Sequence, residues 1–86
     1  MTIFFHKCFA KQYRRLNRKL QKQVDIKIAL FYQNPYDPHL NNHSLHGVYK
    51  EYRSIDITGD YRAWYKQLSE EVVEFRIVDT HSNLYS

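Results

Sequence analysis

The spacing of apolar residues divides the chain into an N-terminal helical part and a C-terminal part built of strands. Residues 2–5 are a short apolar run that predicts a strand. From His6 onward the period changes, and apolar residues recur at intervals of four, three and four positions, which is typical of an amphipathic helix. This stripe consists of Phe9, Tyr13, Leu16 and Leu20.

A second helix is predicted from about residue 21 to residue 33, with Val24, Ile28 and Phe31 facing inward. The bend between the helices is expected near residues 20–23, because the apolar stripe shifts there. Pro35 predicts the end of the second helix, since the residue before a proline disfavours the α region. Residues 36–46 are rich in Asn, His, Pro and Asp and predict a loop.

After Gly47 the period becomes two, which indicates strands. Three strands are predicted, over residues 48–57, 61–66 and 72–79, and residues 67–71 form a polar turn between the last two. Residues 58–60 are the predicted hairpin turn, with Gly59 supplying a positive φ. One face of the first strand carries Tyr49, Arg53, Ile55 and Ile57, and the other carries Tyr52, Ser54 and Asp56. In the last strand Val73, Phe75 and Ile77 alternate with Glu74 and Arg76.

The predicted order is β-α-α-β-β-β in a chain of 86 residues. This order favours an α+β fold in which two N-terminal helices pack on one face of a mostly antiparallel four-stranded sheet. A chain of this length forms one domain, so residues 1–86 are expected to fold as a single unit.

Charge is distributed unevenly along the chain. The net charge is +4, but residues 1–24 carry +7 and the remainder carries −3. A one-sided basic segment favours a polyanion partner such as RNA, or an acidic protein segment. By charge alone, a solvated basic helix face without a partner is an equally good interpretation.

Three motifs in the C-terminal half resemble the YafQ-like branch of the RelE toxin family. They are HSLHG at 43–47 followed by Tyr52 and Arg53, GDYRAWY at 59–65, and THSNLY at 80–85. The resemblance covers about residues 38–86, while the helical half fits the family in pattern and charge only. It implies a microbial-ribonuclease-like fold and the toxin of a type II toxin–antitoxin system. Such toxins cleave translated mRNA, often in the ribosomal A site, and are neutralised by an antitoxin.

The resemblance also implies site residues. By position, His43, Asp60, His81 and Tyr85 match the catalytic histidine, aspartate, C-terminal histidine and aromatic residue of the YafQ-like proteins. Arg62 matches the arginine that other RelE relatives use at the scissile phosphate. The family often has an aspartate and a histidine in the second strand, where this chain has Ser54 and Asp56. That departure shifts the expected proton transfer to His43, Asp60 and His81.

These residue types suit metal-free RNA cleavage. A deprotonated 2′-hydroxyl can attack the adjacent phosphorus and expel the 5′-oxygen, giving a 2′,3′-cyclic phosphate. We expect Asp60 or His43 to be the base, His81 the acid and Arg62 the phosphate clamp. Tyr85 would stack on or orient an RNA base. Flanking phosphates would be held by Arg53 and by the helical residues Arg14, Arg15, Arg18, Lys19 and Lys22.

Each assignment has a structural alternative. Asp60 follows a glycine, where an aspartate is common in turns for structural reasons alone. Arg62 could form an ion pair with Asp56 or Glu74. Tyr85 could pack under the last strand. His39, His43 and His46 suggest zinc, but they lack a cysteine partner and a helix to present them, so no metal and no cofactor are expected. The rival functions are a degenerate toxin that binds antitoxin or ribosome without cleavage, and a plain RNA-binding domain.

The expected partners are mRNA, the ribosome and a cognate antitoxin with an acidic binding segment. Cys8 is the only cysteine, so no internal disulfide can form, and this fits a cytoplasmic protein. No apolar run approaches the roughly 18 residues of a membrane helix, so no membrane span is expected.

Overall fold

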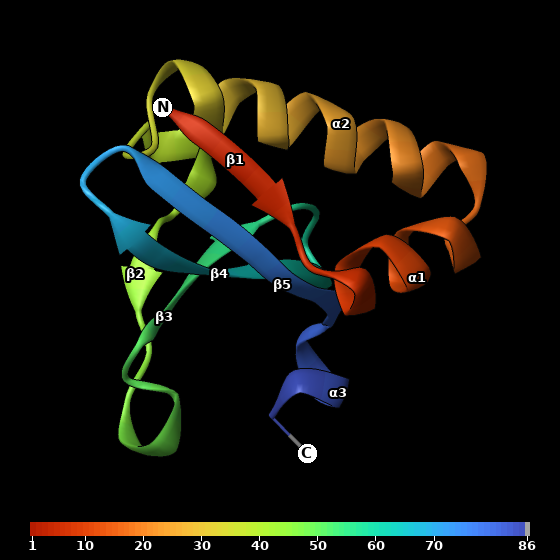
Figure 1. Cartoon of the computed structure of the whole chain (residues 1–86). Coiled ribbons are helices and arrows are strands. Elements are labelled where there is room, and N and C mark those ends of the chain that lie inside the picture. The colour runs from red at the N-terminus through yellow and green to blue at the C-terminus, as the bar shows by residue number, and fades with distance from the viewer. Residues whose placement is uncertain (86) are drawn as a thin grey trace.

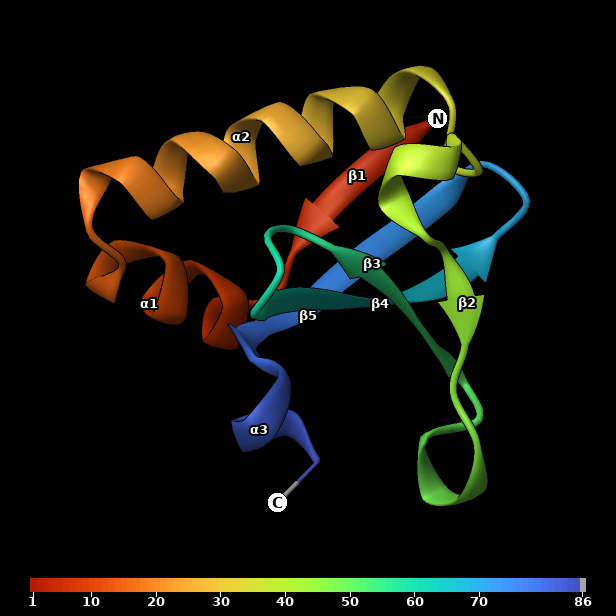
Figure 2. The ribbon, with the colours of Figure 1, turned by 180° about the vertical axis from the view of Figure 1, so that it is seen from behind.

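The computed structural model of the chain describes residues 1–85. Its strands pair in the order β1-β5-β4-β3-β2, with β1 parallel to β5 and the other neighbours antiparallel. Helices α1 and α2 lie along one face of this sheet, and α3 lies on the opposite side (Figures 1 and 2). The elements are β1 (Thr2–Phe5), α1 (Lys7–Arg15), α2 (Arg18–Gln33), the short 3₁₀ helix η1 (Pro38–Leu40), β2 (His43–Ser44), the 3₁₀ helix η2 (Gly47–Tyr49), β3 (Tyr52–Asp56), β4 (Tyr61–Ser69), β5 (Val72–Thr80) and α3 (His81–Leu84).

The predicted α+β class is confirmed, with one difference in strand count. The described residues form five strands rather than four, because the two-residue strand β2 lies within the predicted loop. The predicted strand 48–57 begins later, at Tyr52, since Gly47–Tyr49 forms a 3₁₀ turn instead. No helix in residues 1–85 is long and apolar enough to cross a membrane.

The boundary between the first two helices differs from the prediction. Helix α1 ends at Arg15, and Leu16 has extended backbone angles, so Leu20 belongs to α2 rather than to the first helix. Asn17 begins α2, because its side-chain Oδ1 accepts a hydrogen bond of 2.9 Å from the backbone N–H of Leu20. The predicted bend near residues 20–23 was therefore wrong, and the missed signal was asparagine, a favoured N-cap residue. The predicted end of α2 before Asn34–Pro35 is confirmed.

The main core lies between the two helices and the sheet. Its centre is aromatic: the rings of Phe31 and Tyr65 meet edge-on at 4.8 Å between centroids, and Phe31 and Phe75 do so at 5.1 Å. Rings of this size each bury a large apolar area, so together they contribute much of the stabilisation of so small a core. The fully buried aliphatic residues around it include Val24, Leu40, Ile55, Ile57, Val73 and Val78.

Strand β5 contains a bulge that reverses which side of the sheet its side chains face. Trp64 pairs with Ile77, whereas the next residue of β4, Tyr65, pairs with Phe75, so Arg76 is an extra residue on β5. As a result Phe75 and Val78 both reach the helix-covered core, and Ile77 packs on the other face. The predicted regular alternation of Phe75 and Ile77 on one face was therefore wrong.

The face away from α1 and α2, here called the open face, carries a second apolar cluster around Trp64. Leu45, which directly follows β2, and Leu84 from α3 are buried against it, and Tyr52 and Ile77 are partly buried there. The ring of Tyr49 lies 5.0 Å from that of Trp64. This cluster fixes α3 against the sheet and thereby determines where the C-terminal motif lies.

Turn chemistry also departs from the prediction at residues 58–60. Gly59 does not have a positive φ; among glycines only Gly47 does, at 66°. The turn is held instead by Thr58, whose Oγ1 accepts hydrogen bonds from the backbone N–H groups of Asp60 at 3.2 Å and Tyr61 at 3.0 Å. A hydroxyl that bonds the following backbone is a recognised alternative to a left-handed glycine.

The two glycines should consequently respond differently to alanine. Gly47→Ala is expected to lower the free energy of unfolding by about 1–2 kcal/mol, the cost of a Cβ in left-handed backbone. Gly59→Ala is expected to change it by less than about 1 kcal/mol, and to raise it if unfolded-state entropy dominates, because a Cβ there meets no atom within 4 Å. Urea denaturation of both variants measures the difference. Equal losses would contradict the backbone assignment.

Candidate active site on the open face

Strand pairing arranges the side chains of the open face in two neighbouring rows. In the first row His43 of β2 is opposite Ser54 of β3, Ser54 is opposite Trp64 of β4, and Trp64 is opposite Ile77 of β5. Directly paired residues lie on the same face of a sheet. His43 therefore lies on the open face, at the edge nearest η1.

The second row contains Arg62 between two carboxylates. Asp56 on β3 and Asp79 on β5 are both register partners of Arg62 on β4. The Arg62 Nε lies 3.0 Å from Asp56 Oδ1, and Nη1 donates to the carbonyls of Thr58 at 2.8 Å and Tyr61 at 3.1 Å. The ion pair to Asp56 is close but is not aligned as a hydrogen bond. The Arg62 side chain retains 18% exposure, so the guanidinium is anchored at the surface.

His81 is the first residue of α3 and is exposed. Its backbone N–H donates to the carbonyl of Asp60 at 2.8 Å, which joins the hairpin turn to the start of α3. Thr80 caps α3, because its Oγ1 accepts from the backbone N–H of Asn83 at 3.1 Å. The His81 and Tyr85 rings lie 4.6 Å apart, so one helical turn presents an imidazole and a phenol together.

Tyr85 connects this imidazole to the sheet. Its ring packs edge-on to Trp64 at 5.5 Å while the residue stays 49% exposed. Trp64 and Arg62 lie two positions apart on β4, and their side chains therefore share a face. The fold thus brings His81, Tyr85 and Arg62 to the same side of the sheet, with Asp60 in the adjoining turn and His43 across the strands.

The other predicted RNA contacts lie elsewhere. Arg53 shares its face with Tyr65, its register partner, and so faces the helix side of the sheet. Its Nε donates to Asn42 Oδ1 at 2.8 Å, and its guanidinium carbon lies 5.5 Å from the Tyr36 ring centroid. The basic residues of the helices lie in the opposite layer, around the junction of α1 and α2: Arg14, Arg15, Arg18, Lys19 and Lys22. Helix α1 nevertheless packs at the end of β5 from which α3 begins (Figure 1).

Trp64 and Ser54 are the site residues that sequence reasoning underrated. Trp64 is 4% exposed and Ser54 is 1% exposed. Both carry a buried polar atom without a hydrogen-bond partner in residues 1–85, the indole Nε1 and the hydroxyl Oγ. No period in the sequence indicated that Leu84 of α3 and Tyr49 of η2 would pack against Trp64.

The histidine-rich loop does not gather into a metal site in the described part of the chain, where no three His, Cys, Asp or Glu side chains converge. His39 belongs to a separate pair with Asp37, whose Oδ1 accepts from the His39 backbone N–H and lies 2.9 Å from its ring Nδ1. These two hydrogen bonds lower the pKa of the Asp37 carboxyl. Asp37 thereby caps η1 and fixes the start of the loop that ends at His43.

Comparison with known proteins identifies the fold. No protein-family model and no curated protein matches the chain in sequence. Among solved structures, YafQ from E. coli strain BL21(DE3) is 22% identical, with a TM-score of 0.76 over 98% of this chain and 97% of that one. A YoeB/ParE toxin from Agrobacterium tumefaciens is 19% identical, with a TM-score of 0.78 over 94% of this chain and 99% of that one.

A third similar structure is the RelB–RelE antitoxin–toxin complex from Methanococcus jannaschii. It is 21% identical, with a TM-score of 0.75, and the match covers 96% of this chain and 95% of that chain. These matches span nearly the whole of each chain, including the helical half, where the sequence carries no motif. The chain therefore has the fold of the RelE and YafQ toxins, as its C-terminal motifs predicted.

Proposed function

We propose that this protein is the toxin of a type II toxin–antitoxin system and a metal-independent endoribonuclease that cleaves mRNA. The observation that carries the proposal is the shared side of His81 and Arg62: an exposed imidazole on α3 and an anchored guanidinium on β4, connected through Tyr85 and Trp64. Cleavage by the 2′-hydroxyl requires a base, an acid and a fixed positive charge at the phosphate, and His81 and Arg62 suit the last two roles. Neither group is buried in the helix-covered core.

The reaction uses the nucleophile that RNA supplies. His43 or Asp60 removes the proton of the 2′-hydroxyl, the oxygen attacks the adjacent phosphorus, and the bond to the 5′-oxygen breaks. His81 gives a proton to that leaving oxygen, so the products are a 2′,3′-cyclic phosphate and a 5′-hydroxyl. Each well-placed proton-transfer group contributes roughly 10²–10⁴ in rate.

Arg62 stabilises the charge on the phosphate oxygens. A guanidinium stays protonated at any physiological pH, and its Nη2, which is outside the anchoring contacts, can donate to phosphate oxygens. Its anchors to Asp56, Thr58 and Tyr61 hold it in place before the substrate arrives, so little reorganisation is needed during the reaction. Tyr85, half-exposed above Trp64, can stack on an unpaired base.

The basic residues around the α1–α2 junction bind flanking phosphates, of mRNA or of ribosomal RNA. Seven basic residues precede the first acid of the chain, and such binding weakens as salt rises. Binding of these basic residues to ribosomal RNA would hold the protein on the ribosome, and this favours ribosome-bound mRNA as the substrate. Arg53, held by Asn42 on the other face, contributes through the loop that it anchors rather than at the scissile bond.

The chemistry of the cleaved ends tests the proposal. Purified protein incubated with ribosome-bound mRNA in EDTA is expected to give fragments with 2′,3′-cyclic phosphate and 5′-hydroxyl ends. These ends block direct 5′ adaptor ligation and become ligatable after treatment with polynucleotide kinase. Intact mRNA under these conditions, or fragments with 5′-phosphate ends, would contradict the proposed reaction. A matched preparation of Arg62→Ala controls for contaminating nucleases.

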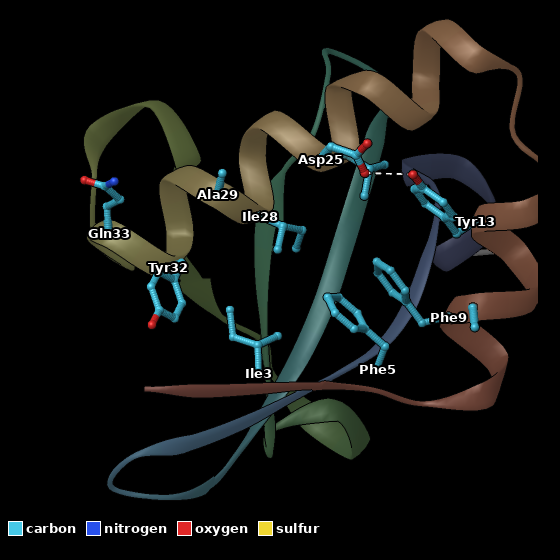
Figure 3. A pocket seen from close by; sticks show the side chains of 11 residues that line it. Ile3, Phe5, Phe9, Tyr13, Asp25, Ile28, Ala29, Tyr32 and Gln33 are labelled. Atoms are coloured by element: carbon cyan, nitrogen blue, oxygen red, sulfur yellow. Dashed lines mark hydrogen bonds between the residues drawn. The ribbon is translucent and has the colours of Figure 1, made fainter.

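We also propose a cognate antitoxin as the partner. The similar structures include two toxin–antitoxin complexes, DinJ–YafQ from E. coli and RelB–RelE. In this chain an apolar groove of about 640 Å³ runs between β1, α1 and α2. Figure 3 shows Ile3, Phe5, Ile28 and Tyr32 around it, with the Tyr13–Asp25 hydrogen bond at one end. Basic residues of α2 adjoin that end, so an antitoxin segment with apolar anchors and acidic flanks matches the surface.

Charge placed in this groove should separate binding from cleavage. Ile28→Glu is expected to weaken antitoxin binding at least 10-fold, because the buried carboxylate would lose its hydration against apolar walls. Cleavage by the free variant should stay within about 2-fold, since α2 lies in the opposite layer from the open face. Calorimetric titration with the antitoxin measures the first effect. Lys27→Glu, one position away, is the control for charge alone, and equal losses in both would contradict docking in the groove.

The second candidate function is a non-cleaving module that binds antitoxin or ribosome. One observation favours it: Arg62 already has a carboxylate and two carbonyls as partners. The state of the cellular transcripts distinguishes the two functions. A module that binds the ribosome can also arrest growth, but only the nuclease leaves cleaved transcripts that antitoxin expression prevents.

A further inference from the structure

We infer that Asn41 and Asp56 are positioning residues, which set the protonated nitrogen of His43 and the orientation of Arg62. The inference rests on the proposed ribonuclease function. Three contacts link the two candidate catalytic side chains. His43 Nδ1 lies 2.8 Å from the Asn41 carbonyl oxygen, Asn41 Nδ2 lies 3.5 Å from Asp56 Oδ2, and Asp56 Oδ1 lies 3.0 Å from Arg62 Nε.

The first contact selects the tautomer of His43. A carbonyl oxygen can only accept a hydrogen bond, so the Nδ1 of His43 must carry the proton. In the neutral ring Nε2 is then left with a free lone pair, the state that a general base needs. His43 is thus prepared to remove the 2′-hydroxyl proton. This arrangement favours His43 over Asp60 as the base.

The backbone of Asn41 is unusual in a way that serves this contact. It has φ 47° and ψ 48°, and in residues 1–85 no other residue except glycine has a positive φ. Left-handed backbone is costly for most side chains but is tolerated by asparagine. The same residue therefore presents its carbonyl to His43 and its amide to Asp56.

The loop around Asn41 is held rigidly from the other side. Asn42 Nδ2 donates to the Pro35 carbonyl at 2.8 Å and to the Tyr65 hydroxyl at 2.9 Å. Asn42 Oδ1 accepts from Arg53, and Leu40 is fully buried in the main core. The two neighbouring asparagines therefore have different roles: Asn42 fixes the loop to the core, and Asn41 contacts His43 and Asp56.

Asp56 fixes the other end of the chain of contacts. Its Oδ1 is buried against Arg62, and the carbonyls of Thr58 and Tyr61 hold Nη1. In the described part of the chain none of these anchors uses Nη2. Nη2 therefore keeps its two N–H groups for a phosphate, and the inferred role of Asp56 is to hold the guanidinium in this rotation.

The tautomer can be measured without any assay of activity. Two-bond ¹⁵N–¹H correlation spectra, recorded well above the usual histidine pKa of about 6.5, distinguish protons on Nδ1 from protons on Nε2. The His43 signals are assigned by their loss in His43→Gln. The parent protein is expected to show the Nδ1–H form. An Nε2–H form, the one that free imidazole side chains favour in water, would overturn the inference.

Two substitutions at Asn41 form a matched pair. Asn41→Gly keeps a backbone that tolerates positive φ and keeps the carbonyl, so His43 should remain in the Nδ1–H form. Asn41→Val strongly disfavours this φ and should shift His43 toward Nε2–H, with cleavage about 10–100-fold slower, the usual effect of losing such an orienting partner. Retention of both the tautomer and the rate in Asn41→Val would overturn the inference.

Asp56→Asn tests the second positioning residue. Cleavage is expected to fall about 10–100-fold while the His43 tautomer and the urea midpoint stay close to those of the parent. Glu74→Gln is the control, because Glu74 forms an ion pair of 3.2 Å with Arg76 at another place on the sheet. Faster cleavage by Asp56→Asn would mean that the ion pair between Asp56 and Arg62 inhibits the reaction, and it would overturn the positioning role.

If the parent protein cleaves no RNA, the proposed function fails, and the spectra still decide the contact between Asn41 and His43.

Discussion

His81→Ala is expected to slow RNA cleavage by about 10²–10⁴-fold, the usual contribution of one proton-transfer group. The free energy of unfolding should change by less than about 0.5 kcal/mol, as for other exposed positions. The physical reason is that the imidazole is exposed and contacts Tyr85, whereas the fold uses the His81 backbone, whose N–H bonds the Asp60 carbonyl. Alanine keeps that backbone hydrogen bond and removes only the titrating ring.

Single-turnover cleavage of ribosome-bound mRNA measures the rate, and urea denaturation measures the stability. Ser82→Ala is the matched control, since Ser82 is the next exposed residue of the same short helix. Cleavage by His81→Ala within about 3-fold of the parent would show that another group protonates the leaving oxygen. A large loss of stability would instead assign the ring a structural role.

Trp64→Ala is expected to cost about 3–5 kcal/mol of unfolding free energy, the range found when a buried aromatic residue is truncated. Small domains have about 5–15 kcal/mol in total, so this loss is a large share of the stability of the chain. The reason is position: Trp64 is the residue against which Tyr49, Tyr52 and Tyr85 all pack. Without it α3 loses its main contact with the sheet.

Trp64→Phe separates packing from hydrogen bonding. The buried Nε1 has no partner in the described residues, and removing an unpaired donor recovers part of its desolvation cost. We expect this variant to lose less than half of what Trp64→Ala loses. Urea denaturation followed by far-ultraviolet circular dichroism measures both. Equal losses would show that Nε1 forms a hydrogen bond that stabilises the fold.

Local sequence patterns predicted the helices, the long strands and the fold class, because each rests on a period of apolar positions. They failed where a single side chain or one extra residue decides the outcome. Asn17 starts α2 through one hydrogen bond to Leu20, and the stripe of apolar residues continues across that break. Strand β2 has only two residues, too few for any period to appear.

The candidate site was predictable in part. Motifs placed His43, Arg62, His81 and Tyr85, and the fold brings them to one side of the sheet. The predicted alternation placed Arg53 on the face of Ile55, and its pairing with Tyr65 agrees; its contact with a flanking phosphate stays a prediction. The roles of Asn41 and Asp56 could not be predicted, since they depend on a left-handed backbone and on contacts across 15 positions of sequence.

The extra residue in β5 gives this strand a tolerance for one change in length. Arg76 has no register partner on β4, so Phe75 and Ile77 occupy successive positions of the pairing and face opposite sides of the sheet. Deletion of Arg76 alone would make the strand regular and leave Ile77 opposite Trp64 and Asp79 opposite Arg62, so α3 would still begin on the same side. Deletion of a second residue would move every following side chain to the other face and carry the imidazole away from the guanidinium. Related chains that keep the same chemistry should therefore differ between these two ends by the bulge residue at most.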